Sequence, residues 1–283
     1  MTSLLPSPLS RSALVAELRA AGCVFAEDEA ELLMTAAGTP DELAAMAERR
    51  IAGEPLEHLL GWAEFCGMRM AVEAGVFVPR RRTEFLVRQA AAALVAGRDR
   101  DPGAVPVVLD LCCGSGAVGA ALAARTDGHI ELHACDVDPA AARCARRNVA
   151  PYGGHVHEGD LFGPLPARLR GRVDVLVANV PYVPAGEVAL LPPEARLHEP
   201  LVALDGGPDG LDVLRRVAAG APGWLVPGGF LLVETSGRQA PYALEALAAC
   251  GLTAEAATSG EFSATVLTAT APPAGRNTSA RAR

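Results

Sequence analysis

The chain has 283 residues, of which half are apolar and a fifth are charged, enough for one large domain or an ordinary domain with a small one beside it. A net charge of −8 argues against a protein whose affinity comes from contacts with nucleic-acid phosphates. All 25 basic residues are arginine, so chemistry that needs a catalytic lysine is excluded.

Three features of the sequence bear on the compartment. The chain has no run of about 18 apolar residues, and its first segment, interrupted by Pro6 and Pro8, does not resemble a signal peptide. The seven cysteines are scattered, without the spacing of metal ligands. We therefore expect a cytoplasmic protein with reduced, buried cysteines and no metal, and nothing in the chain demands more than a monomer.

Residues 1–53 are expected to form a small helical domain. Ser7-Pro8 can start a first helix, and residues 27–37 fit a second one. Thr39-Pro40-Asp41-Glu42 has the pattern of a capping box in front of a third helix, which is expected to end at Gly53.

Residues 54–82 differ in character, because glycines interrupt short apolar stretches such as Gly75-Val76-Phe77-Val78. This pattern favours short strands or a hairpin that serve as a linker. A helix is expected from Thr83 to Ala96, and the polar segment that follows it contains Pro and Gly and reads as a break.

From Pro106 onward, strands and helices alternate. Strands are expected at 107–111, 130–135, 173–178, 229–234 and 264–270, with helices at 117–125, 138–148, 209–219 and 239–250. Such alternation is typical of an α/β fold with a doubly wound, mostly parallel sheet, which binds ligands at the carboxyl ends of its strands. The catalytic domain is expected to span 83–270, followed by a disordered tail at 271–283.

The strongest local motif is the glycine-rich turn Gly114-Ser115-Gly116 between a strand and a helix. Glycines let the backbone approach a ligand closely, and the free N–H groups of a helix start face a polar or anionic group. Asp136 ends the next strand, where a carboxylate can accept hydrogen bonds from both ribose hydroxyls of an adenosine.

Two cofactors fit this turn. Together with Gly119, the glycines match the G-x-G-x-x-G pattern of nicotinamide and flavin dinucleotide sites. Asp110, just before the turn, would repel a pyrophosphate but suits the amino group and sulfonium of S-adenosylmethionine. S-adenosylmethionine is therefore the favoured cofactor.

Five further residues lie at the same predicted edge. A nucleophilic role for Cys112 or Cys113 is conceivable because a helix N-terminus lowers a thiol pKa, but the nearby acid opposes it, and small size is the plainer explanation. Asp160 could accept a hydrogen bond from an adenine amino group, and Leu161 or Phe162 could cover the ring. A turn aspartate followed by core residues explains this segment equally well.

The decisive motif is Asn179-Val180-Pro181-Tyr182, which follows a buried strand. Asn and Pro are ordinary in a strand-ending turn, but this turn should lie beside the glycine loop at the mouth of the site. The Asn179 side-chain carbonyl and the Val180 backbone carbonyl can both accept from one planar NH₂ group, on which Tyr182 can stack. The motif thus predicts a site that holds an amide or amino-purine nitrogen in line with a methyl donor.

This motif resembles the N-P-P-Y signature of the HemK/PrmC family of protein-glutamine N5-methyltransferases. Glu54–Gly61, Gly75–Glu84 and His198–Leu204 resemble further elements of that family, and together the matches cover most of residues 50–235. The resemblance implies an N-terminal domain that engages a protein substrate and a seven-strand, Rossmann-like methyltransferase domain. The substrate would be a glutamine in a release factor or ribosomal protein.

Carried onto this chain, the resemblance assigns cofactor contacts to the loop from Cys112 to Gly116, Asp136, Leu161 and Asn179, and the glutamine to Asn179, Val180, Pro181 and Tyr182. We also assign Asp110 and Asp160 to the cofactor site, because of the chemistry of their carboxylates and not because of the resemblance.

The chain departs from the family pattern at four places. Val180 replaces the first proline, which keeps the carbonyl but frees φ. Cys112 replaces the first loop glycine, and a small residue such as cysteine is tolerated there only if its φ is negative. Arg81 and Arg82 replace a proline and an acid, and residues 260–267 replace the family's acidic, tyrosine-rich C-terminal ending. These departures indicate a related subgroup.

Three other functions remain open. An adenine-N6 nucleic-acid methyltransferase would use a similar motif, but the acidic balance and the lack of lysine argue against it. A non-catalytic S-adenosylmethionine-binding protein is a further alternative, against which the presence of both Asn179 and Asp136 argues. A nicotinamide-dependent oxidoreductase would leave Asp110 and the N-V-P-Y turn without a role.

Overall fold

The computed structural model describes residues 9–98 and 103–273. Its first three helices, α1 (Arg11–Ala20), α2 (Ala26–Ala36) and α3 (Pro40–Ile51), pack into one small apolar cluster. The Ser10 hydroxyl accepts from the N–H of Ala13, and the Thr39 hydroxyl accepts from that of Glu42, so side chains cap α1 and α3. The second and third helices lie where they were predicted, whereas the predicted start at Ser7-Pro8 falls outside the described residues.

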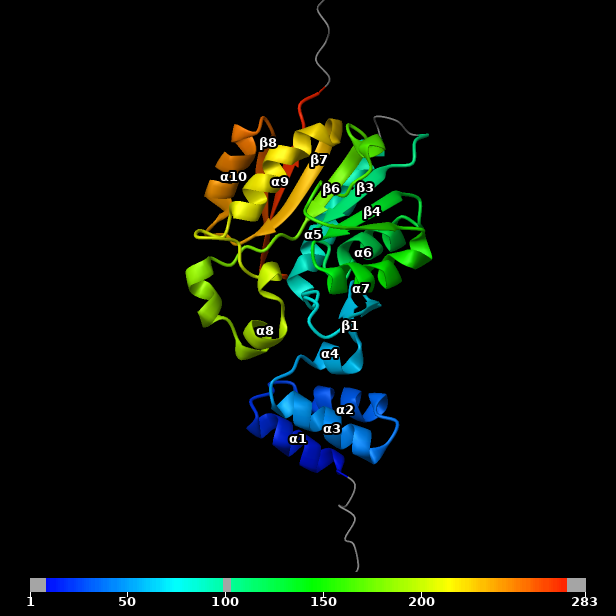
Figure 1. Cartoon of the computed structure of the whole chain (residues 1–283), viewed down its shortest axis with the longest axis vertical. Coiled ribbons are helices and arrows are strands. Elements are labelled where there is room, and N and C mark those ends of the chain that lie inside the picture. Colours follow the sequence, from blue (N-terminus) through cyan, green and yellow to red (C-terminus); the bar gives the residue numbers. More distant parts are fainter. Residues whose placement is uncertain (1–8, 99–102, 274–283) are drawn as a thin grey trace, which may run out of the picture.

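A short linker joins these helices to the rest of the chain (Figure 1). Helix α4 (Leu56–Leu60) packs against the N-terminal cluster, and β1 (Trp62–Phe65) pairs with β2 (Met68–Ala71) as an antiparallel hairpin. The apolar stretch 75–78 is not a strand. The Val76 carbonyl lies 2.9 Å from His58 Nε2, and the Val78 N–H donates to Glu199, so these backbone groups bond side chains rather than a neighbouring strand.

The larger part of the chain is a seven-stranded sheet of order β5-β4-β3-β6-β7-β9-β8. Every pairing is parallel except those of β9, which runs antiparallel to both of its neighbours. The strands are β3 (Val107–Leu111), β4 (Glu131–Asp136), β5 (His155–Glu158), β6 (Val173–Ala178), β7 (Leu225–Thr235), β8 (Thr253–Ser259) and β9 (Ala264–Thr270). This is the expected doubly wound α/β sheet, and β3 and β6 lie side by side at its centre.

Helices cover both faces of the sheet. Helices α5 (Glu84–Arg98), α6 (Ala117–Arg125) and α7 (Pro139–Val149) pack on one face, and α9 (Asp212–Gly220) and α10 (Ala240–Ala249) on the other. The fully buried strand β3 shows both layers, because Leu109 packs toward α9 and α10 while Val108 packs toward α5 and α6. Short 3₁₀ turns occur at Arg81–Thr83, Ala150–Tyr152, Ala167–Leu169, Ala185–Leu190, Leu201–Ala203 and Ala221–Gly223.

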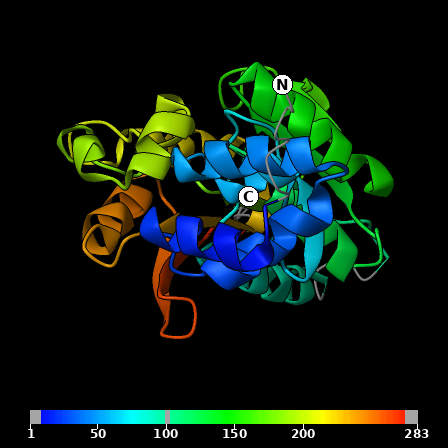
Figure 2. The ribbon, with the colours of Figure 1, turned by 90° about the horizontal axis from the view of Figure 1, so that it is seen from below.

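Helix α8 (Pro193–His198) belongs to a long connection, residues 179–211, between β6 and α9. Seen from below, this yellow-green segment lies beside the blue N-terminal helices (Figure 2). Arg50 of α3 links the two, because it pairs with Glu29 of α2 and approaches Glu194 of α8 to 3.7 Å.

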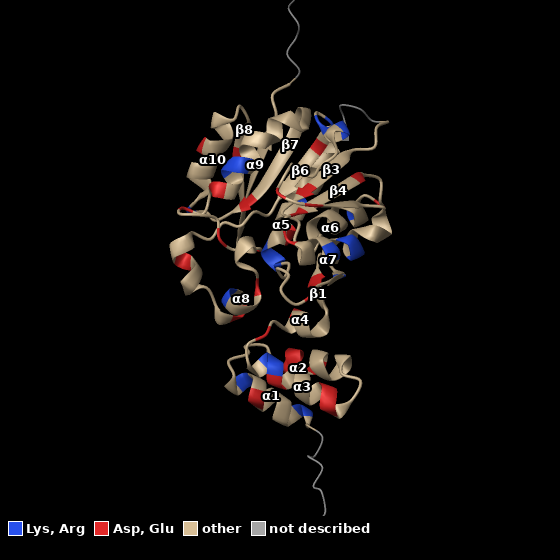
Figure 3. Cartoon of the chain, in the orientation of Figure 1, with Lys and Arg blue, Asp and Glu red and all other residues tan. Residues whose placement is uncertain are grey.

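No helix in the described part of the chain is both long and apolar enough to cross a membrane. In the view of Figure 3, basic and acidic residues are interspersed over the N-terminal helices and the sheet region.

Candidate active site

The glycine loop runs from the end of β3 to α6, and an acid on the neighbouring strand holds it. Asp136, at the end of β4, accepts from the Gly114 N–H at 2.8 Å and from the Asp138 N–H at 2.9 Å. Burial raises the pKa of Asp136, and these N–H groups oppose the rise. Asn148 of α7 donates to the Ser115 carbonyl at 2.8 Å and also bonds the backbone of Ala71, so hairpin, helix and loop share one side chain.

The backbone of the loop differs from the expectation at Cys112. Its φ is +53°, in the left-handed region. The sequence analysis expected a negative φ at this position, because cysteine replaces a glycine there. The thiol side chain packs against the core on the α9–α10 side of the sheet. Packing therefore holds a conformation that costs an L-residue about 1 kcal/mol or more.

Asp110 is buried on β3 and lies behind the loop. It accepts from the Gly119 N–H at 2.8 Å, and a Cβ added to Gly119 would lie 3.1 Å from the same carboxylate oxygen. Burial raises the pKa of Asp110 to about 7. A carboxyl group poised near neutrality is well suited to a cationic ligand, which stabilises its ionised form.

A cavity of about 590 Å³ opens at the carboxyl ends of β3, β4 and β6. Its size lies in the usual range of small-molecule sites. Of the predicted site residues, the cavity is lined by Asp110, Cys112, Cys113, Gly114, Ser115, Asp136, Asp160, Leu161, Asn179, Val180, Pro181 and Tyr182.

Gly116 is the predicted cofactor residue that does not line the cavity. Its φ is +76°, and an added Cβ would lie 3.0 Å from the backbone of Ala145 on α7. Gly116 thus lets α6 begin against α7, a packing role that the glycine spacing alone does not reveal.

The two thiols of the loop are poor nucleophiles. Burial, reinforced by the nearby Asp136 carboxylate, raises the pKa of Cys112 and of Cys113 well above the ordinary value. This argues for the small-residue interpretation of both positions.

The three residues that follow β5 and Gly159 have different contacts. Asp160 forms an ion pair with Arg216 of α9, and both line the cavity. Leu161 also lines it and is buried, whereas Phe162 stacks on Trp224 with ring centroids 5.6 Å apart. Of the two apolar candidates, Leu161 is therefore the one placed to cover a ligand ring.

The N-V-P-Y turn follows β6 directly. Within residues 9–98 and 103–273, neither the Asn179 side chain nor the Val180 carbonyl has a hydrogen-bond partner, so both acceptors are free at the cavity. The Val180 side chain is buried in the core, which anchors the turn. Two free acceptors on adjacent residues are the arrangement that a planar NH₂ group requires.

Tyr182 is held by groups that the sequence analysis did not single out. Its hydroxyl lies 3.4 Å from Glu234 Oε1 at the end of β7, and the same oxygen pairs with Arg82 Nε at 3.1 Å. The Arg82 guanidinium also lies over the Tyr182 ring, 5.5 Å from its centroid. Burial raises the pKa of Glu234 above its ordinary value, and the nearby Arg82 guanidinium offsets only part of this rise. Glu234 is about fifty residues from Tyr182 in sequence, so no local pattern could reveal the contact.

Besides Asp110, a second buried acid, Glu199, lines the cavity. Glu199 Oε1 pairs with Arg80 at 2.5 Å and accepts from the Val78 N–H at 3.2 Å, while Oε2 has no partner among the described residues. Glu199 and Arg80 belong to two of the segments that carried the family resemblance, and the fold brings these segments together.

Comparison with known proteins agrees with this geometry. The family model "Methyltransferase small domain" matches residues 73–191. A release factor glutamine methyltransferase of Geobacter sulfurreducens is 41% identical over 200 residues, covering 69% of this chain and 66% of that protein. The Streptomyces coelicolor protein of the same name is 40% identical over 197 residues, covering 69% and 68%. A 4-amino-L-phenylalanine/4-methylamino-L-phenylalanine methyltransferase of Streptomyces pristinaespiralis is 40% identical over 186 residues, covering 66% and 62%.

The fold and the match together define the class as an S-adenosylmethionine-dependent methyltransferase. A sheet with one antiparallel strand, a glycine loop after β3 and an acid at the end of β4 supply the cofactor side of such an enzyme. The chain belongs to the family of release factor glutamine methyltransferases, the HemK/PrmC family.

Proposed function

We propose that this chain transfers a methyl group from S-adenosylmethionine to the side-chain amide nitrogen of a glutamine in a peptide chain release factor. The carrying observation is the pair of free acceptors, Asn179 and the Val180 carbonyl, at the mouth of the cavity behind the glycine loop. The relatives of Geobacter and Streptomyces coelicolor are named for this activity.

The residues around the cavity suit the cofactor by their chemistry. The buried Asp110 carboxyl would face the cationic end, and Asp136, which already orients Gly114, would accept from the ribose. Leu161 offers an apolar wall for the adenine, and Asp160 an acceptor for its amino group. When bound, S-adenosylmethionine supplies an activated methyl group, so the protein needs no covalent nucleophile.

The chain's own contribution is orientation and electrostatics. The amide nitrogen is a weak nucleophile because its lone pair is delocalised. Asn179 and Val180 would fix the NH₂ group through both hydrogens and stabilise the positive charge that grows on nitrogen during attack. The methylated nitrogen would release one proton to water, leaving the cofactor as a neutral thioether. Tyr182, braced by Arg82 and Glu234, would cover the planar amide.

The remaining parts of the proposal concern the partner. Residues 1–53 would engage the release factor, and Val24 and Phe25, 82% and 67% exposed between α1 and α2, offer an apolar contact. Residues 54–82 would act as the linker and 83–270 as the catalytic domain. The enzyme would work as a monomer in the cytoplasm, without contact to nucleic acid or membrane.

A second candidate function rests on the Streptomyces pristinaespiralis relative, whose named substrates are free aromatic amines. An aryl NH₂ group can use the same two acceptors as an amide. The distinction is therefore one of acceptor size, which the assay below addresses.

The test is transfer of labelled methyl from S-adenosylmethionine by the full chain. Acceptors are purified release factors, ribosomal proteins, 4-amino-L-phenylalanine, and RNA and DNA. We expect label on a release-factor glutamine, located by peptide mass spectrometry, and its loss in the Asn179→Ala variant. Label on the free amino acid would favour the second candidate, and label on nucleic acid would overturn the proposal.

A further inference from the structure

The N-V-P-Y turn is enclosed by a loop that joins the end of the α8 segment to α9. The Val183 N–H donates to the Leu204 carbonyl at 3.0 Å, and the Gly206 N–H donates back to the Val183 carbonyl at 2.8 Å. The loop approaches so closely that an added Cβ would lie 2.6 Å from the Pro181 carbonyl oxygen at Gly206 and 2.3 Å from the Tyr182 carbonyl oxygen at Gly210. Only glycine fits at these two positions.

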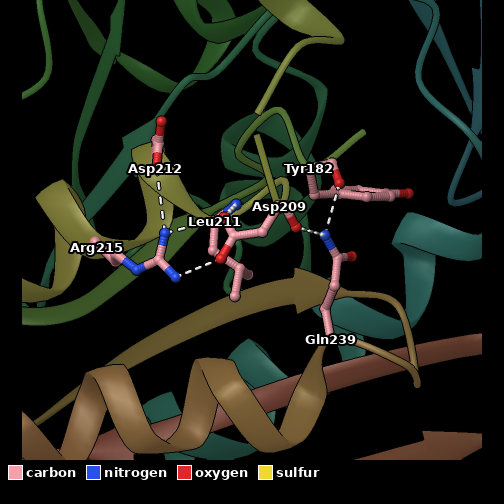
Figure 4. Close-up of polar contacts among 6 residues, drawn as sticks. All are labelled: Tyr182, Asp209, Leu211, Asp212, Arg215 and Gln239. Atoms are coloured by element: carbon pink, nitrogen blue, oxygen red, sulfur yellow. Dashed lines mark hydrogen bonds and ion pairs between the residues drawn. The ribbon is translucent and has the colours of Figure 1, made fainter. Parts of the chain in front are cut away.

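One buried side chain joins the turn to this loop. Gln239, just before α10, donates from Nε2 to the Tyr182 carbonyl at 2.9 Å and to the Asp209 carbonyl at 3.0 Å (Figure 4). Its Oε1 accepts from the Ser236 hydroxyl at 2.6 Å. Both partners of the nitrogen are acceptors and the partner of the oxygen is a donor, so the orientation of the amide is fixed and all of its contacts are satisfied.

The far end of this bridge has hydrogen bonds of its own. The Asp209 carboxylate accepts from the Leu211 N–H at 3.1 Å and from Arg215, which also reaches Asp212 at 3.2 Å (Figure 4). These bonds tie the loop at Asp209 to the start of α9, and Gln239 joins that loop to Tyr182.

We propose that Gln239 is a positioning residue for methyl transfer: it fixes the turn that presents Asn179 and the Val180 carbonyl to the acceptor. In this chain it supplies the restraint that the first proline of an N-P-P-Y turn supplies through its ring. Valine at 180 has no ring to fix φ, and Gln239 holds the backbone of the same turn through its hydrogen bond to the Tyr182 carbonyl. This inference rests on the proposed function.

The first experiment is a double-mutant cycle with Gln239→Leu and Val180→Pro, using the full chain and a release factor. Leucine fills the space but donates nothing. We expect Gln239→Leu to lower kcat about 10-fold or more, with KM for the release factor and Kd for S-adenosylmethionine changed by less than about 3-fold. With proline at 180, the same substitution should lower kcat less than about 3-fold, because the ring restrains the turn. An unchanged kcat in Gln239→Leu, or equal losses in both backgrounds, would overturn the inference.

The second experiment disturbs the same contact without altering Gln239. In Gly210→Ala, the new methyl group would lie 2.3 Å from both Gln239 Nε2 and the Tyr182 oxygen. Gly251→Ala is the matched control, because its φ of +80° is close to the +78° of Gly210 and an added Cβ meets nothing within 4 Å. We expect kcat to fall about 10-fold in Gly210→Ala only. Equal kcat in the two variants contradicts the inference.

Amide hydrogen exchange separates this inference from the proposed function. The Val183 amide, bonded to Leu204, should exchange faster in Gln239→Leu and should recover when proline is also present at 180. If the wild-type chain transfers no methyl to any release factor, the proposed function fails, and this readout still decides whether Gln239 restrains the turn. Unchanged exchange at Val183 would reject that role whatever the activity.

Discussion

Arg50 of α3 and Glu29 of α2 form an ion pair at 2.6 Å in which each side chain is only 11% exposed. Arg50 also donates to the Glu54 carbonyl at 2.9 Å and approaches Glu194 on α8. One guanidinium therefore joins the N-terminal helices, the start of the linker and the segment that borders the cavity.

We expect Arg50→Ala to destabilise the chain by about 3 kcal/mol, because it leaves the buried Glu29 carboxylate without its partner. Urea unfolding followed by circular dichroism measures the change. Arg11→Ala is the control, since Arg11 pairs with Glu31 at a site where both side chains are more than half exposed, and it should cost about 0.5 kcal/mol or less. Equal losses in the two variants would show that the Arg50 pair is not a buried link.

A pH dependence follows from Asp110, whose pKa burial raises to about 7. The native state holds this proton more tightly than the unfolded chain does. The contribution of Asp110 to stability is therefore fully present below the unfolded pKa near 4 and is lost as pH rises toward 7. Asp110→Asn removes the titration, so the free energy of unfolding of the variant, relative to that of wild type, should rise between pH 4 and pH 7. A constant difference would mean that Asp110 titrates normally.

The same group makes a prediction for the cofactor. S-adenosylmethionine carries positive charge and should favour the ionised carboxylate, so its affinity should fall as pH drops below 7, and binding near pH 7 should release a proton. Isothermal titration calorimetry in buffers of different ionisation enthalpy measures both effects. In Asp110→Asn the affinity should be lower and independent of pH over this range. A pH-dependent affinity in that variant would assign the titration to another group.

The sequence predicted the centre of the sheet better than its edges. Val107–Leu111 and Val173–Ala178 are apolar runs buried on both faces, and their bounds agree with the prediction. Strands β5 and β8 were not predicted, because edge strands such as His155–Glu158 and Thr253–Ser259 carry polar or small residues and no apolar run.

The candidate site shows the same division. The glycine loop and the N-V-P-Y turn are each one unbroken stretch of sequence, so their residue spacing reveals them. Residues that brace the turn and the loop come from distant segments, as Gln239 does for Tyr182 of the turn and Asn148 for Ser115 of the loop. Such contacts depend on strand order and on close approaches at glycine, neither of which a linear pattern records.

The positive φ of Cys112 gives a prediction about stability. Cys112→Gly and Cys112→Ala both delete the sulfur atom, but only glycine relieves the left-handed conformation. We expect the glycine variant to be more stable than the alanine variant by about 1 kcal/mol in urea unfolding. The same pair at Cys113, whose φ is not positive, should give the opposite order. If alanine is as stable as glycine at 112, the loop does not hold that conformation in solution.

Asn179 carries the most direct prediction for catalysis. Asn179→Ala removes one of the two acceptors and should lower kcat about 10²-fold, the usual loss for one preorganised polar group. Asn179→Gln keeps the amide but displaces it by one methylene, so it should also lose most of its turnover, since orientation rather than polarity is limiting. Steady-state methyl transfer with a release factor measures both, and thermal melting confirms that each variant is folded. Turnover near the wild-type rate in either variant would remove Asn179 from the acceptor site and leave the Val180 carbonyl without its proposed partner.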